Sequence, residues 1–155
     1  MTPPTHLLES PTHLAAAVRW MTGSDVPAAL YIEDMCHSDP WDSEGFQLAM
    51  RNGSSFAIAA THGRRLVGYL FFVTHGEGDL EVVNLTIHPD FQRQGIGAQL
   101  LDFLSETDPC LVWTVILETN VAAQYFFRDQ GFRLARVVPD YNHGVRGYIM
   151  EKPVN

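Results

Sequence analysis

The stretch that decides the fold is Asn84–Leu104, which reads NLTIHPDFQRQGIGAQLLDFL. Its first residues, including Leu85 and Ile87, are typical of a buried strand, and its last residues place Ile96 and Leu100 at the spacing of one helix face. A glycine-containing turn joins the two. A strand, a glycine turn and a helix in this order often hold phosphate, because the first N–H groups of the helix lack internal partners and lie at the positive end of its dipole.

Three residues of the turn suit an anion. Gly95 and Gly97 lack the Cβ atoms that would keep a phosphate away from the backbone amides, and Arg93 adds a positive charge. The sequence is not a Walker loop, because no Gly-Lys-Ser/Thr follows, and it lacks the third glycine of the dinucleotide fingerprint. Gly-x-Gly alone is equally compatible with an ordinary strand–turn–helix.

A longer pattern is more specific. Gln92–Gly97 (QRQGIG) resembles the Gln/Arg-x-x-Gly-x-Gly/Ala signature of the GNAT N-acetyltransferases. Asn120–Phe132 (NVAAQYFFRDQGF) is similar to that family's Asn-x-x-Ala…Tyr-x-x-x-Gly-Phe helix and its exit. The likeness covers roughly residues 18–152, and the nearest branch is that of the bacterial ribosomal-protein alanine N-acetyltransferases.

The order of expected elements is that of an α+β fold: a GNAT-like mixed, mainly antiparallel central sheet with helices on both faces. Helices are expected at 26–36, 43–52, 96–104 and 120–130, and strands at 17–21, 56–60, 66–73, 80–87, 110–117, 132–138 and 148–151. The segment 139–147 is expected to be a loop. In the first helix, the inward positions are expected to be Val26, Ala29, Leu30 and Ile32 with Met35. Residues 1–16 are expected to be a mobile N-terminal tail, and 17–155 a single domain.

Bulk composition excludes several classes of protein. The chain is 46% apolar and 18% charged, which is globular, and its net charge of -8 argues against a nucleic-acid surface and favours an amine-bearing partner. The two cysteines, Cys36 and Cys110, have no Cys-x-x-Cys spacing, and the seven histidines form no ligand cluster, so no metal site is expected. The sequence contains no membrane-spanning run or secretory signal, so we expect a cytoplasmic protein.

The resemblance implies acetyl-CoA as the acetyl donor. Its pyrophosphate would lie on the amides of Arg93, Gln94, Gly95, Ile96, Gly97 and Ala98. Its pantetheine arm would pair like an extra strand with Leu85, Thr86 and Ile87, which requires this strand to separate from the 113–117 strand. Asn120 matches a cofactor-contacting position, and it is equally suited to cap the following helix.

The catalytic positions of the nearest branch hold other residues here. Counting back from Asn120, its glutamate position falls on Val115, and its thiolate-protonating tyrosine falls on Phe127. Neither side chain moves a proton. Two carboxylates are candidates for the lost base: Glu81, which matches the base of the histone-acetyltransferase branch, and Glu118, at the end of the next strand. The alternative to a catalytic role, for both residues, is that of a solvated charge on the surface.

Two residues are candidates for the acceptor side: Trp41, in the loop between the first two helices, and Tyr141, in the loop before the last strand. The alternative for each is that its side chain only packs against the core or the loop. The resemblance implies direct acetyl transfer to a primary amine, on a protein N-terminus or on a small amine such as a polyamine, amino acid or aminoglycoside. A non-catalytic domain that senses acyl-CoA is the third reading, supported by Val115 and Phe127. A homodimer is one state that the resemblance allows.

Overall fold

The computed structural model describes residues 13–154. Its order of elements runs from β1 to β7, with four α-helices between the strands. The strands are β1 (Ala17–Trp20), β2 (Ser55–His62), β3 (Arg65–His75), β4 (Asp79–Ile87), β5 (Leu111–Leu117), β6 (Arg133–Asn142) and β7 (Val145–Pro153). The helices are α1 (Val26–Cys36), α2 (Ser43–Arg51), α3 (Ile96–Ser105) and α4 (Val121–Asp129).

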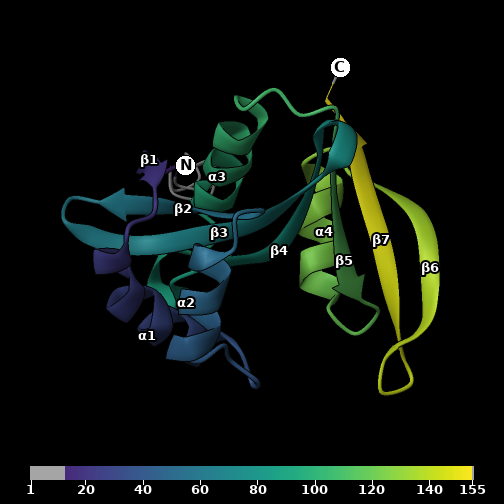
Figure 1. The fold of residues 1–155 in the computed structure, drawn as a ribbon, viewed down its shortest axis with the longest axis horizontal. Helices are drawn as coiled ribbons and strands as arrows, with labels where there is room; N and C mark the ends of the chain where they lie inside the picture. The colour runs from purple at the N-terminus through teal and green to yellow at the C-terminus, as the bar shows by residue number, and fades with distance from the viewer. Residues whose placement is uncertain (1–12, 155) are drawn as a thin grey trace, which may run out of the picture.

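The strands form one sheet in the order β1-β2-β3-β4-β5-β7-β6 (Figure 1). Within the part of the chain that the structure describes, only the β4–β5 pair is parallel. This confirms the expected mixed, mainly antiparallel sheet.

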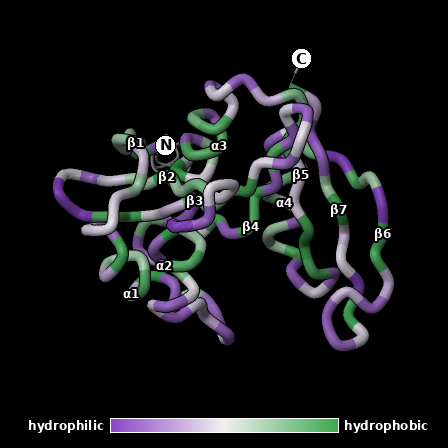
Figure 2. Tube along the Cα trace, viewed as in Figure 1, coloured by the Kyte–Doolittle hydropathy of each residue, from purple (hydrophilic) through white to green (hydrophobic). Residues whose placement is uncertain are grey.

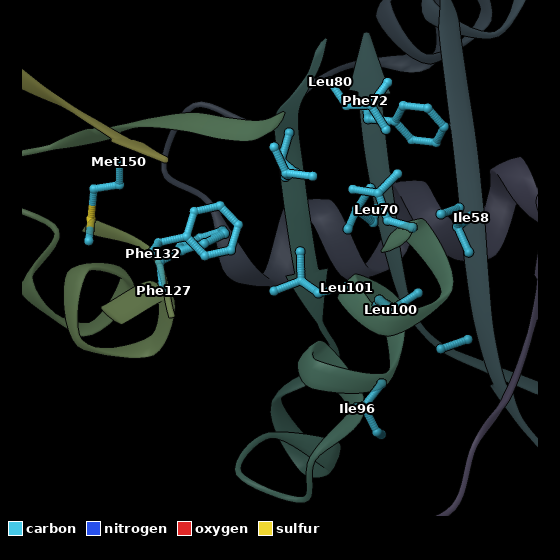
Figure 3. Close-up of a cluster of buried hydrophobic side chains, with 14 of the residues drawn as sticks. Ile58, Leu70, Phe72, Leu80, Ile96, Leu100, Leu101, Phe127, Phe132 and Met150 are labelled. Atoms are coloured by element: carbon cyan, nitrogen blue, oxygen red, sulfur yellow. The ribbon is translucent and has the colours of Figure 1, made fainter. Parts of the chain in front are cut away.

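The helices cover both faces of the sheet, as expected. On one face α3 and α4 enclose an apolar core in which Ile96, Leu100 and Leu104 of α3 are almost fully buried, and Phe127 and Phe132 continue it toward β7 (Figure 3). On the other face α1 and α2 enclose a second core around Phe46 and Tyr69. The turn that joins the ends of β2 and β3 is hydrophilic (Figure 2).

The segment that leads into β1 lies beside α3. The backbone N–H of Leu14 donates to the carbonyl of Gln94, and the Gln99 side chain bonds the backbone of both Leu14 and Ala16. Leu14 and Ala16, which were expected in the tail, therefore have partners for their backbone groups at the start of α3. Residues 1–12 of the expected tail lie outside the described residues.

The C-terminal hairpin is longer than expected, and the prediction of a loop over 139–147 is wrong. β6 runs to Asn142 and β7 starts at Val145, so Tyr141 lies in a strand. Pro139 is tolerated there because β6 is the edge strand and its register shifts between Val138 and Asn142, where a missing N–H costs no ladder bond.

An ion pair fixes β1 to the start of α1. Arg19 donates to both carboxylate oxygens of Asp25, at 2.7 and 2.8 Å, and the backbone N–H of Thr22 donates to the same carboxylate at 2.8 Å. The hydrogen bonds from Arg19 hold the pKa of Asp25 below its ordinary 3.8, although burial acts in the opposite direction. Because the folded-state pKa is lowered, this contribution to stability is present above the ordinary pKa and is lost as pH falls through the lowered one.

Asp25→Asn is therefore expected to lower the free energy of unfolding at pH 7 by about 1–3 kcal/mol. The difference between the variant and the wild type should shrink as the pH is lowered below about 4, where the wild-type carboxylate also becomes neutral. Urea unfolding of the variant and the wild type at pH 7 and at a pH below about 4 measures this difference. Asp39→Asn, at an exposed position after α1, is the control and should not change the free energy of unfolding at either pH. A constant difference at both pH values would contradict the assignment to the ion pair.

Candidate active site

The sheet opens between β4 and β5. Their ladder pairs Asp79–Val82 with Leu111–Thr114 and ends there, and beyond it the two strands diverge (Figure 1). The predicted separation of the 85–87 strand from the 113–117 strand is confirmed. The side of β4 that faces the gap is free to pair with something other than β5.

A cleft of about 560 Å³ occupies this opening. It is lined from four directions: by β4, by the turn into α3, by one side of α4, and by the end of α1. Of the residues that the sequence indicated for the cofactor, the cleft brings together Leu85, Thr86, Ile87, Arg93, Gly95, Ile96, Gly97, Ala98 and Asn120. Gln94 lies in the same turn but outside the lining, and its carbonyl accepts the hydrogen bond from Leu14.

The turn into α3 has the geometry of an anion cradle. Arg93 and Gly95 both have left-handed backbones, with φ of 61° and 84°. Residues in this region next to right-handed ones turn successive N–H groups toward one point, which favours an anion. The N–H groups of Ile96, Gly97 and Ala98 begin the helix and have no partner within it. These N–H groups are therefore placed to donate to a phosphate, beside the ring of His13.

Gly97 has a separate, steric role. A Cβ on Gly97 would lie 2.9 Å from the ring of Phe126, so glycine lets α4 approach the start of α3. Asn120 closes the same end of the cleft: its side chain accepts a hydrogen bond from the backbone N–H of Ala123 at 3.2 Å, so its predicted capping role is confirmed.

At the other end of the cleft lies a buried polar network that the sequence did not indicate. Glu33 of α1 is only 2% exposed and faces β3 and β4. Its carboxylate accepts hydrogen bonds from the Tyr69 hydroxyl at 2.9 Å and from the Asn84 amide at 2.8 and 3.2 Å. Burial raises the pKa of Tyr69 against an opposing effect of Thr86, and the charge of Glu33 raises it further, so this hydroxyl stays a donor.

The network reaches the cleft through Thr86 and His37. The Thr86 hydroxyl donates to Asn84 Oδ1 at 2.7 Å and lies 2.9 Å from His37 Nε2. The same Nε2 is 3.5 Å from Glu33 Oε1. Both His37 and Thr86 line the cleft, as does Cys36, whose thiol donates to the carbonyl of Ile87 at 3.4 Å.

The two carboxylates predicted from the sequence as bases lie outside the lining of this cleft. Glu81 is in the part of β4 that is still paired with β5, and its carboxylate is 3.0 Å from His75 Nε2. Glu118 follows β5, and its carboxylate accepts from the backbone N–H of Arg146 at 3.3 Å. Each carboxylate thus has a local partner of its own.

The two residues predicted for the acceptor side pack against their surroundings. Trp41 makes edge-to-face contacts with Phe46 and Phe71, with ring centroids 5.5 and 5.2 Å apart, and joins the core under α2. Tyr141 is half exposed and lies over Gly147, where an added Cβ would come within 2.7 Å of its ring and 2.9 Å of Val115. Phe127 lines the cleft while packing on Phe126 and Phe132.

The residues missed by sequence reasoning include Glu33 and His37. Glu33 is separated from Val26 and Ala29 by helical intervals that place all three on one face, so a carboxylate on an apolar face was a usable signal. Met35, predicted to be inward, is 40% exposed. That prediction is wrong because Glu33 is the residue that points toward the sheet, where Tyr69 and Asn84 donate hydrogen bonds to its carboxylate.

Comparison with known proteins agrees with this architecture. The model of the acetyltransferase (GNAT) domain matches residues 52–134, more than half of the chain. The chain belongs to the GNAT acetyltransferase family. It is therefore a GNAT-family N-acetyltransferase. Among curated proteins, it is 30% identical over 133 residues to the [ribosomal protein bS18]-alanine N-acetyltransferase of Escherichia coli K12, covering 76% of this chain and 81% of the relative.

Solved structures show the same fold. The ribosomal-protein-S18-alanine N-acetyltransferase from Escherichia coli matches with a TM-score of 0.80 at 22% identity, over 91% of this chain and 95% of that one. An aminoglycoside 6'-N-acetyltransferase complexed with coenzyme A matches with a TM-score of 0.78 at 14% identity, over 90% and 97%. These confirm the GNAT-like α+β fold expected from the sequence.

Within residues 13–154, no helix is long and apolar enough to cross a membrane. The same residues contain no group of three or more histidine, cysteine, aspartate or glutamate side chains placed to hold a metal ion.

Proposed function

We propose that this chain transfers the acetyl group of acetyl-CoA directly to a primary amine, with a peptide N-terminus as the acceptor. The observation that carries the proposal is the continuity of the cleft, which runs from the anion cradle at Arg93–Ala98, along the open side of Leu85–Ile87, to the end of α1. The diphosphate would bind at the first end and the extended pantetheine along the strand, which leaves the thioester near Thr86 and His37.

Direct transfer is favoured over an acyl-enzyme by the state of Cys36. This thiol lines the cleft, but burial, and then the negative charge of Glu33, raises its pKa. A protonated thiol is a poor nucleophile. The attacking group is therefore the amine itself, and the unpaired side of β4 supplies backbone groups beside the reacting carbonyl.

A peptide N-terminus is supported by the names of the curated relatives, which act on the alanine of a ribosomal protein. A small amine acceptor is the close alternative. A domain that binds acetyl-CoA without transferring its acetyl group is favoured by one observation: Val115 and Phe127, at the positions of the branch's two catalytic side chains, are apolar.

Release of free thiol from acetyl-CoA tests these readings. The amines would be an alanine-starting peptide, the same peptide with a blocked N-terminus, a polyamine and an aminoglycoside. We expect turnover on the free N-terminus that exceeds turnover on the other amines by at least about 10-fold, a difference of about 1.4 kcal/mol in transition-state binding. Fastest turnover on a small amine would replace the peptide acceptor, and acetyl-CoA binding without turnover would favour the sensing domain.

A further inference from the structure

We propose that His37 is the general base that removes the proton from the acceptor amine, and that Glu33 is the positioning residue that holds His37 for this task. The inference rests on the proposed function and adds the base that the sequence left unassigned. Its basis is a chain of hydrogen bonds whose direction can be followed from the buried carboxylate to the cleft.

The chain determines which nitrogen of His37 carries the proton. Asn84 donates its amide N–H groups to Glu33, so its oxygen faces Thr86 and accepts the single hydroxyl proton of Thr86 at 2.7 Å. Thr86 then has only lone pairs to offer at 2.9 Å from His37 Nε2. Nε2 must therefore be the N–H, and Nδ1 must hold the lone pair in the neutral ring.

That lone pair is available to a substrate. The His37 side chain is 40% exposed and lines the cleft, and the structure gives Nδ1 no hydrogen-bond partner among residues 13–154. A base that is held through one ring nitrogen and open at the other has the arrangement required for proton transfer.

Glu33 is suited to support the charged ring. It is 2% exposed, and its Oε1 lies 3.5 Å from Nε2, so its negative charge attracts the imidazolium formed when Nδ1 takes a proton. The titratable groups nearest the ring are Glu33 and Cys36 of α1. Tyr69 of β3 is connected to the ring through the network, and Arg93 lines the same cleft. Tyr69 and Asn84 hold Glu33 itself.

The reaction balances with these residues. His37 Nδ1 takes one proton from the incoming ammonium. The lone pair that this leaves on the amine nitrogen then attacks the thioester carbon. The C–N bond forms and the C–S bond breaks. The amine nitrogen loses a second proton, which goes to the departing sulfur to give the free thiol. His37 returns its proton to solvent, so one proton is released for each acetyl group transferred.

The base also favours one class of amine. A peptide α-amino group has an ordinary pKa of about 8, close enough to that of a histidine for proton transfer, whereas a lysine side chain has one of about 10.4. Proton transfer to a histidine therefore favours an N-terminal amine over a lysine ε-amine.

The test compares the wild type with His37→Asn, His37→Ala and Glu33→Gln, and uses His143→Asn in the exposed β6–β7 turn as the matched control. Thiol release is measured on the alanine-starting peptide from pH 6 to 9.5, and acetyl-CoA affinity by calorimetry. We expect His37→Asn to lower kcat/KM by about 100-fold at pH 7, to move the acidic limb of the profile up to the pKa of the substrate amine, and to bind acetyl-CoA normally. Added imidazole should restore part of the activity of His37→Ala. Glu33→Gln should lower kcat with little change in KM and displace the acidic limb.

The outcomes separate the inference from the proposed function. Wild-type turnover that His37→Asn leaves within about 3-fold, with the same pH profile, overturns the inference and leaves the function standing. A displaced acidic limb in Glu81→Gln, and not in His37→Asn, gives the role to Glu81 and also overturns it. A wild type that binds acetyl-CoA but releases no thiol with any amine overturns both.

Discussion

Replacement of Gly95 by glutamate is expected to weaken acetyl-CoA binding by at least about 100-fold, a loss of about 2.7 kcal/mol. Gly95 has φ of 84°, and a Cβ at this position would lie 2.6 Å from the ring of His13. A glutamate must therefore either strain the turn or rotate it out of the left-handed region, which turns the amides of the cradle away from the cleft. Its carboxylate also adds a negative charge where the diphosphate would bind.

Two controls separate the cradle from the strain. Gly63, in the β2–β3 turn, also has a left-handed φ, of 62°, and an added Cβ would meet nothing within 4 Å. Gly63→Glu introduces the same charge and a similar strain far from the cleft, so its acetyl-CoA affinity by calorimetry should equal that of the wild type. Gly95→Ala isolates the backbone effect from the charge. Normal binding by Gly95→Glu would show that the phosphates lie elsewhere.

The turn into α3 and the start of α4 could be predicted from the sequence because their determinants are local. Gly95, Gly97 and the cap at Asn120 each set the conformation of their own turn, and a turn leaves a short motif that sequence reasoning can recognise. The order of strands and helices was predictable for the same reason. The long hairpin of β6 and β7 was not, because Pro139 signals a break unless its strand is known to be at the edge of the sheet.

The polar network around Glu33 could not be predicted, because its residues meet only in three dimensions. Glu33 and Asn84 are 51 positions apart, and Glu33 and Tyr69 are 36 apart. The sequence shows a glutamate on an apolar helix face, but the partners that make its burial tolerable become visible only when α1 packs on β3 and β4. Glu81 was chosen for its match to the histone-acetyltransferase branch and Glu118 for its place at the end of a strand, and the structure places each beside a local partner.

Glu33 is also expected to be the most sensitive polar position for stability. Glu33→Ala should lower the free energy of unfolding by about 3–5 kcal/mol, the range found when one partner of a buried charged network is removed. The variant leaves the buried Tyr69 hydroxyl and the partly buried Asn84 amide without their acceptor. Each unsatisfied buried group costs about 1–3 kcal/mol.

Asp34→Ala is the matched control, because Asp34 is the next residue of the same helix and is exposed. It removes the same charge and changes helix propensity in the same direction, so its effect should stay within about 0.5 kcal/mol. Glu33→Gln retains the volume and one acceptor oxygen, and we expect an intermediate loss of about 1–2 kcal/mol. Urea unfolding of the three variants at pH 7 measures the series.

The order of the series distinguishes the possible reasons for a buried glutamate. If Glu33→Ala and Asp34→Ala destabilised the protein equally, the network around Tyr69 and Asn84 would carry no stability. If Glu33→Gln were as stable as the wild type but slow in acetyl transfer, the negative charge would serve catalysis alone. A large loss in Glu33→Ala, a smaller one in Glu33→Gln and none in Asp34→Ala would mean that the same carboxylate holds α1 on the sheet and orients His37 in the cleft.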